Sequence, residues 1–179
     1  MDLSHEESRM SAVPILLADA LTTVINTAQA ANQLGTLSFT AVRSYPDWDD
    51  DFKDLKALEV DVVPVTSAGD LVDLDAEGTI NTEPAVDICV RKRFEPGDRT
   101  TSGAKDGRLK KTAVDPLVVL VGAIHKLLSA NRGTAVTLSG SVVANWLDAT
   151  VRTYCDYKRL RDGCFLGVVR VRYDVSEAN

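Results

Sequence analysis

The sequence predicts an α+β fold, in which a mostly antiparallel β-sheet carries two amphipathic helices packed on one face. Two long segments repeat apolar residues at steps of three and four, which is typical of helices with one buried side. Several shorter segments alternate apolar and polar residues, which is typical of strands with one buried face. Their order, helix, three strands, helix and two strands, fits this layered arrangement.

The first helix is expected over residues 14–31. One side of this segment carries the apolar residues Leu17, Leu21, Val24 and Ala28 at helical spacing. Pro14 suits the first turn of a helix, where its missing N–H would have had no partner within the helix. Gly35 suits the left-handed position that follows a helix.

Three strands are expected next, over residues 37–43, 59–66 and 84–94. The third has an apolar side and a more polar side: Val86, Ile88 and Val90 against Asp87, Cys89 and Arg91. Pro64 lies inside the second strand and cannot donate to a ladder, which predicts an edge position or a bulge there. Residues 49–58 are expected to form one or two helical turns.

The second half of the chain is expected to contain a helix and two strands. The helix opens at Asp115–Pro116, an acidic N-cap followed by proline in the first turn, and runs to about residue 130. A variable piece over 131–143 precedes a strand over 144–153, a turn over 156–163 and a last strand over 164–175.

Residues 95–112 are rich in glycine and charge and contain almost no apolar group except Leu109. Such a segment cannot bury enough apolar surface to offset its ordering entropy, so we expect a mobile basic loop there. Residues 1–11 are expected to be flexible. No linker or repeat divides the chain, which predicts a single domain over residues 1–179.

The composition, with 45% apolar and 26% charged residues, is that of a soluble globular protein. No stretch approaches the roughly 18 to 20 uninterrupted apolar residues that span a bilayer. The acidic N-terminus is unlike a secretory signal. We therefore expect a protein of the cytosol, or of a particle assembled there, with no membrane partner.

No metal site, cofactor or catalytic centre is predicted. The three cysteines, Cys89, Cys155 and Cys164, form no CxxC pair and are expected to be reduced. The acidic cluster over 47–51 lacks the spacing of a calcium loop and reads as a solvated turn. His125 lies beside the apolar stripe of the second helix, which favours a packing or surface role. A carboxylate-dependent nuclease stays an alternative, because the chain holds many acids.

Charge is segregated along the chain. Residues 47–77 hold eleven acids and two lysines, whereas residues 91–111 hold eight bases and three acids. Opposite patches suit head-to-tail contacts between copies of one chain, although two solvated surfaces would also account for them. The interface residues expected on this basis are Asp49, Asp50, Asp51, Asp73, Asp75, Arg99, Lys105, Arg108, Lys110 and Lys111. Arg91–Arg93 and Arg170–Arg172 lack interleaved aromatic residues, so nucleic-acid readout is not predicted.

Several loose residue patterns follow one another along this chain in the order and spacing that one protein family shows. They are the opening helix, Arg43-Ser44-Tyr45-Pro46-Asp47-Trp48 running into residues 54–64, the strand over 86–93, the helix from Asp115, and Leu160-Arg161-Asp162-Gly163-Cys164-Phe165 running to Tyr173. Over about residues 12–174 the chain resembles the tail terminator (tail-completion) proteins of long-tailed bacteriophages.

The resemblance implies a structural virion protein without catalytic activity. Such a subunit forms a ring, expected to be hexameric, that caps the tail tube, ends tube polymerisation and docks the tail to the head. The implied partners are further copies of the chain, the tail tube protein and the head–tail connector or stopper protein, with passive contact to DNA in the bore. The long basic segment over 95–112 and the variable segment over 131–143 depart from the family. A neck or head-completion connector ring is therefore the alternative, and a small regulatory module acting as monomer or dimer is a further one.

Overall fold

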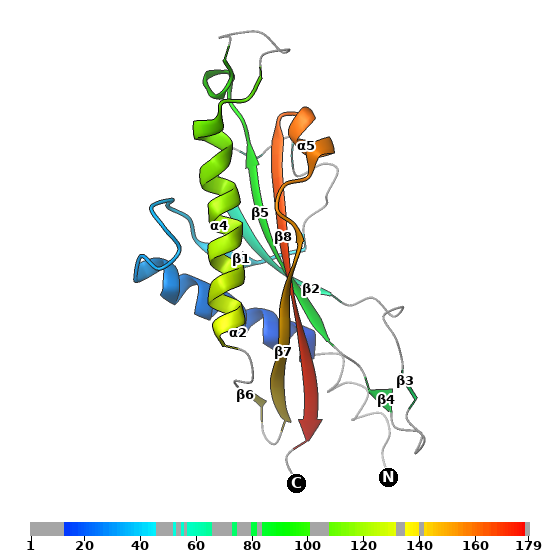
Figure 1. Cartoon of the computed structure of the whole chain (residues 1–179). Coiled ribbons are helices and arrows are strands. Elements are labelled where there is room, and N and C mark those ends of the chain that lie inside the picture. The colour runs from blue at the N-terminus through cyan, green and yellow to red at the C-terminus, as the bar shows by residue number, and fades with distance from the viewer. Residues whose placement is uncertain are drawn as a thin grey trace.

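The computed structural model in Figure 1 describes residues 13–45, 52, 55, 57–65, 73–74, 80–81, 84–100, 108–131, 135–139 and 142–177. Its main sheet has six strands in the order β1-β2-β5-β8-β7-β6. These strands are β1 (Ala41–Arg43), β2 (Glu59–Val65), β5 (Ala85–Arg93), β6 (Ala135–Ser139), β7 (Val142–Thr153) and β8 (Cys164–Glu177). Only β1 and β2 pair in parallel, so the sheet is mostly antiparallel. The predicted α+β fold is confirmed.

Two long helices, α2 (Val13–Ala30) and α4 (Lys111–Ala130), cover one face of this sheet. Helix α2 lies over β1, β2 and β5, whereas α4 lies over β7 and β8. Figure 1 shows α4 running along the long strands, with α2 oriented across it. The remaining elements are the 3-10 turn η1 (Pro96–Asp98), the short helix α5 (Tyr157–Arg161), and a separate pair of strands, β3 (Asp73–Leu74) and β4 (Ile80–Asn81).

The main core lies between the helices and this first face of the sheet. It includes Leu17, Leu21 and Ile25 of α2, Leu117, Leu120, Val121, Ile124 and Leu128 of α4, and Val60, Val62, Val86, Ile88, Val90, Phe165, Val169, Val171 and Tyr173 of the strands. The alternation predicted for the third strand is confirmed, because Val86, Ile88 and Val90 are all fully buried there. Burying each such side chain contributes about 1.5–3 kcal/mol.

Strand β1 is shorter than the predicted strand over 37–43. The side-chain amide of Asn26 bonds both the N–H and the carbonyl oxygen of Ala41, at 2.8 and 2.9 Å. Gln29 Nε2 donates to the carbonyl oxygen of Leu37 at 2.7 Å. These bonds anchor the segment before β2 to helix α2, and those of Ala41 lie on the side of β1 that faces away from β2. Residues 37–40 form no strand.

The edge position predicted from Pro64 is confirmed. Strand β1 pairs with β2 only over Val60–Val62, so at Pro64 the strand has β5 as its one neighbour in the sheet. A residue without an N–H is tolerated on such an open side.

The predicted opening of the second helix at Asp115–Pro116 is wrong, because α4 already begins at Lys111. The carbonyl oxygen of Lys110 accepts from the N–H groups of Ala113 and Val114, at 3.0 and 3.3 Å, which forms a first turn upstream of the proline. Pro116 then lies inside the helix, where it forgoes a single i→i−4 bond.

The segment predicted as one loop over 95–112 contains regular structure at both ends. It holds η1, an isolated bridge between Arg99 and Leu109, and the first residues of α4. Residues 101–107 lie outside the described part, as do residues 1–11 and most of the predicted turns over 49–58, in which Phe52 is helical. The variable piece over 131–143 includes β6, which the sequence reading missed.

The turn predicted over 156–163 contains the helix α5. Asp156 caps it, because its Oδ1 accepts from the N–H groups of Lys158 at 2.8 Å and Arg159 at 3.1 Å. Sequence reasoning missed this helix because five residues are too few for a periodic pattern.

Asp156→Ala is expected to lower the free energy of unfolding by about 1 kcal/mol, since two N–H groups lose their cap. The measurement is urea denaturation. Asp162→Ala, at the exposed other end of α5, serves as the control and should stay within about 0.5 kcal/mol of the parent. Equal losses in the two variants would contradict the capping role.

By length and composition alone, α2 and α4 would each be able to cross a bilayer. In the fold, each packs an apolar side into the core, with Asp19 of α2 and Lys126 of α4 exposed on other sides.

Candidate interaction surface

The face of the sheet opposite to α2 and α4 is here called the second face. Its side chains include Glu59, Asp61 and Val63 of β2, Asp87, Cys89 and Arg91 of β5, and Leu166, Val168, Arg170 and Arg172 of β8. The register places oppositely charged residues beside one another on adjacent strands, with Glu59 opposite Arg91 and Asp87 opposite Arg170. Such cross-strand pairs stabilise the sheet and define its register.

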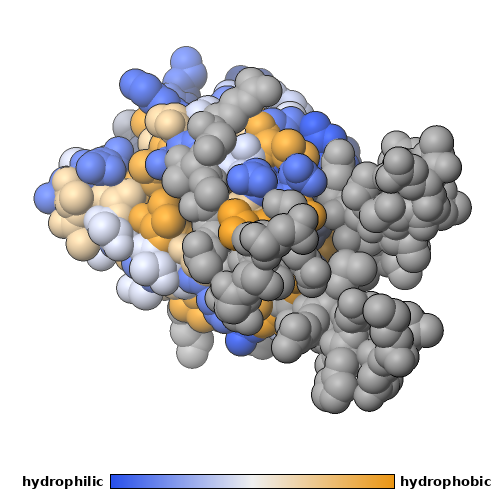
Figure 2. All heavy atoms as spheres, turned by 90° about the horizontal axis from the view of Figure 1, so that it is seen from below, coloured by the Kyte–Doolittle hydropathy of each residue, from blue (hydrophilic) through white to orange (hydrophobic). Residues whose placement is uncertain are grey.

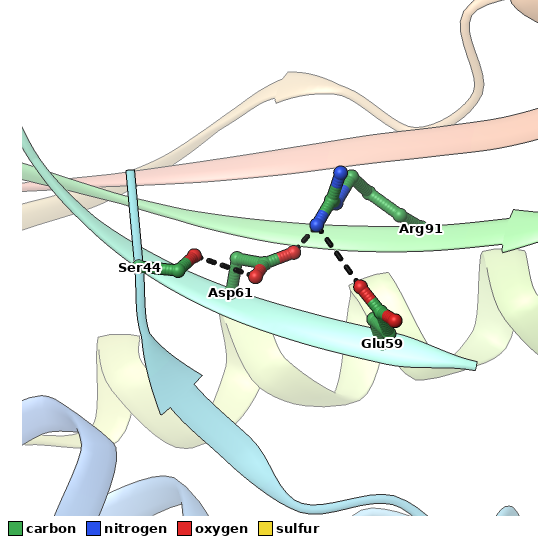
Figure 3. Close-up of polar contacts among 4 residues, drawn as sticks. All are labelled: Ser44, Glu59, Asp61 and Arg91. Carbon is green, nitrogen blue, oxygen red and sulfur yellow. Dashed lines mark hydrogen bonds and ion pairs between the residues drawn. The ribbon is translucent and has the colours of Figure 1, made fainter. Parts of the chain in front are cut away.

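Arg91 is the centre of a buried ion cluster on this face. Its Nε donates to Asp61 Oδ2 at 2.6 Å, and its Nη2 donates to Glu59 Oε2 at 3.0 Å. Ser44 Oγ donates to the other carboxylate oxygen of Asp61 at 2.6 Å, as Figure 3 shows. The side chains of Arg91 and Asp61 are only 4% and 7% exposed. A charge so removed from water requires a partner at hydrogen-bond distance, and each of the two provides it for the other.

Phe52, which lies between β1 and β2 in the sequence, covers this end of the second face. The guanidinium carbon of Arg91 lies 5.7 Å from the ring centroid of Phe52, and that of Arg159 on α5 lies 5.0 Å from it. Phe52 also forms a small second core with Leu55 and Cys164. Stacking of two guanidinium groups on one ring accounts for the burial of Phe52 and of Arg91.

The other arginines of the second face are also held by carboxylates of the same chain. Arg170 forms a bidentate ion pair with Asp87, with both hydrogen bonds at 2.8 Å. Arg172 binds Asp148 of β7 in the same way, at 3.0 and 2.8 Å. Bidentate pairs of this kind occupy the donors that would otherwise face a phosphate. The described part of the second face therefore does not favour nucleic-acid binding.

Of the ten expected interface residues, the structure brings four together near the start of α4. Thr100 N–H donates to the carbonyl oxygen of Arg108, and Lys110 N–H donates to that of Asp98, both at 2.8 Å. These bonds form a stem that places Arg99 near the exposed Arg108, Lys110 and Lys111. The remaining six, Asp49, Asp50, Asp51, Asp75, Lys105 and the side chain of Asp73, lie outside the described part of the chain.

Both charged segments approach the same turn of one chain. Arg99 Nη2 lies 3.0 Å from the point that a Cβ on Gly163 would occupy. Phe52, in the acidic segment, packs against the adjacent Cys164. Glu59 and Asp61 of the acidic segment also pair with Arg91 of the basic segment, so attraction between the two segments operates within a subunit. Their segregation along the sequence does not by itself indicate a contact between copies, which stays a prediction.

The described residues contain no group of three or more His, Cys, Asp or Glu side chains placed to hold a metal ion. His125 Nε2 lies 3.1 Å from the carbonyl oxygen of Ala149, which ties α4 to β7 and fits the packing role expected from the sequence. All three cysteines are free thiols. Burial and the neighbouring Asp87 raise the pKa of Cys89 far above its ordinary value, so its nucleophilic thiolate is suppressed.

Exposed large apolar side chains occur at both edges of the sheet. At one edge lie Val42 and Tyr45, here called the β1 flank. At the other, the β6–β7 pairing ends at Asn145, so the rest of β7 is an edge among the described strands. Val119 of α4 and Tyr154, which follows β7, are exposed there and are called the β7 flank. Seen from below in Figure 2, apolar side chains interrupt the hydrophilic surface in several places.

Comparisons of the chain with protein-family models, with curated protein sequences and with solved structures found no match. The role of the protein is therefore inferred from its sequence pattern and its surfaces.

Proposed function

We propose that the protein is a structural subunit of a closed, hexameric ring of the tail-terminator kind. The ring caps the tail tube of a long-tailed phage, ends tube polymerisation and offers its other side to the head–tail connector. The order of patterns over residues 12–174 supports the family, and the location that follows is the tail or neck of a virion. The protein supplies shape rather than catalysis.

The observation that supports the ring is that exposed large apolar side chains occur at two separate places, with Val42 and Tyr45 at the edge strand β1 and Val119 and Tyr154 beside β7. A twofold dimer needs one self-complementary patch, whereas a ring needs two different patches that complement each other. Exposed apolar side chains at two separate edges provide the second arrangement. A head-to-tail contact that closes on itself leaves no flank exposed.

The basic residues at the start of α4 are proposed to dock the ring on an axial partner. Arg108, Lys110 and Lys111 are exposed, and Lys110 is held by its Nζ donating to the carbonyl oxygen of Gly97 at 2.8 Å. Charges at the rim of an interface mainly set the rate and specificity of docking.

The test is the polymerisation of the tail tube protein from the same particle, followed by electron microscopy of tube lengths. Wild-type protein is expected to shorten the tubes and narrow their length distribution. The triple variant Arg108→Glu, Lys110→Glu, Lys111→Glu should stay folded, because acidic residues are favoured near a helix N-terminus. It is expected to leave the tubes long, and the matched triple glutamine variant should be intermediate.

Two results would count against this proposal. Equal capping by the wild type and the glutamate variant would remove the docking role of the three bases. Tubes unaffected by the wild type would contradict the terminator function. In that case, copurification with portal rather than tube components would favour the neck connector.

A further inference from the structure

Strand β1 is one edge of the main sheet, and a side chain of α2 occupies its outward-facing backbone groups. Ser44 N–H donates to the carbonyl oxygen of Val62 at 3.2 Å, so residues 42 and 44 face β2 and Ala41 faces away from it. Asn26 Nδ2 donates to the carbonyl oxygen of Ala41 at 2.9 Å, and Asn26 Oδ1 accepts from its N–H at 2.8 Å. A carboxamide offers the same donor and acceptor as a peptide group. Asn26 therefore takes the place that a further strand would take at Ala41.

A second edge is the part of β7 beyond its pairing with β6, which ends at Asn145. Tyr173 N–H donates to the carbonyl oxygen of Pro84, so Tyr173 directs its backbone groups toward β5, and Val171 two residues earlier does the same. Ala149 lies opposite Val171 in the register of β7 and β8. The N–H and the carbonyl oxygen of Ala149 therefore point away from β8, toward the edge.

A side chain of α4 binds the backbone of β7 at this point. His125 Nε2 lies 3.1 Å from the carbonyl oxygen of Ala149. A carbonyl oxygen only accepts, so this hydrogen bond requires the proton on Nε2. Shifts in the register with β8 on both sides leave residues 148–151 as a short regular stretch around Ala149. Short and irregular edges accept a new strand poorly.

The two bonds are of one kind. In each, a polar side chain of a covering helix binds the outward-facing backbone of an alanine, at a point where the strand has one neighbour among the described strands. We infer that Asn26 and His125 are edge-capping residues, which prevent a second copy of this chain from adding a strand to β1 or to β7. Unprotected edges template pairing between chains. The inference does not depend on the ring proposed above.

The test measures self-association by sedimentation velocity over a range of protein concentrations. Asn26→Leu and His125→Leu keep an apolar side chain in place but leave a backbone group at the edge without its hydrogen bond. A strand from a second copy then satisfies that group, so we expect each substitution to strengthen open-ended association about tenfold, the factor that corresponds to about 1.4 kcal/mol. The double variant is expected to associate more strongly than either single one.

Matched controls break hydrogen bonds of the same two helices away from the edges. Gln29→Leu removes the bond from Nε2 to the carbonyl oxygen of Leu37, which belongs to no strand. Asn131→Ala removes the bond from Nδ2 to the carbonyl oxygen of Leu127 at the end of α4. Neither control should alter association. His125→Gln keeps an N–H donor and should behave like the wild type.

Three results would overturn the inference. They are unchanged association in the double variant, equal gains in the edge and control variants, and a His125→Gln variant that associates like His125→Leu. Urea denaturation shows whether the variants fold, and if Asn26→Leu does not, the comparison of His125→Leu with His125→Gln decides. Tube capping by the wild-type protein tests the proposed function separately, so either conclusion can fail while the other stands.

Discussion

Gly167→Ala is expected to lower the free energy of unfolding by about 3 kcal/mol, at the upper end of the range for overpacking. Gly167 lies in β8 on the face covered by α4. A Cβ there would lie 2.4 Å from Val121 Cγ2 and 3.1 Å from the carbonyl oxygen of Tyr154. Val121 is fully buried, so it cannot move aside without displacing α4 from the sheet. Urea denaturation measures the loss.

A double-mutant cycle shows whether the clash with Val121 is the cause. Val121→Ala alone should cost about 2 kcal/mol through lost burial and the cavity left behind. Combined with Gly167→Ala, the new methyl group fills part of that cavity, so the total loss should fall short of the sum by 1 kcal/mol or more. Additive losses would mean that the close approach of α4 to β8 at this point does not limit stability.

Asp61→Asn is expected to lower the free energy of unfolding by about 3 kcal/mol. The substitution keeps the shape of the side chain but removes the charge that faces buried Arg91 Nε at 2.6 Å. Breaking a buried pair from one side costs about 3–5 kcal/mol, because the remaining charge stays away from water. Half-exposed Glu59 still contacts Arg91 at 3.0 Å, so we expect a loss at the lower end of this range.

The matched control is Asp148→Asn, which breaks the pair with Arg172 on the same face. The Arg172 and Asp148 side chains are 49% and 32% exposed, so water compensates the loss. Exposed pairs contribute about 0–1 kcal/mol, and added salt should reduce even that. Similar costs for the two substitutions in urea denaturation would contradict the view that burial makes the Arg91 cluster important for stability.

The layers of the fold could be predicted from the sequence because they depend on periodicity. Alternation in 84–94 correctly assigned Val86 and Ile88 to the core face. The ion pairs could not be predicted, because alternation gives the face of a residue but not the register between strands. Asp87 and Arg170 are 83 residues apart, and only the pairing of β5 with β8 brings them together.

Local chemistry explains the remaining differences. Strand β1 is short, and the side chain of Asn26 occupies the backbone groups of Ala41 on the side of the strand away from β2. Helix α5 depends on the Asp156 cap. An aspartate alone does not predict a helix, and five residues are too few to add a periodic apolar pattern to it. Gly167 interrupts an apolar alternation, which is a recognisable sign of close backbone or helix approach. The exposed apolar residues could not be predicted in this way, because the exposure of Val119 depends on how α4 is rotated on the sheet.

The most direct measurement of the central claim is cryo-electron microscopy of the particle that carries this protein. The account predicts a closed ring of copies at the head-proximal end of the tail tube. A single copy without neighbours of its own kind, or copies located away from the tail axis, would contradict it.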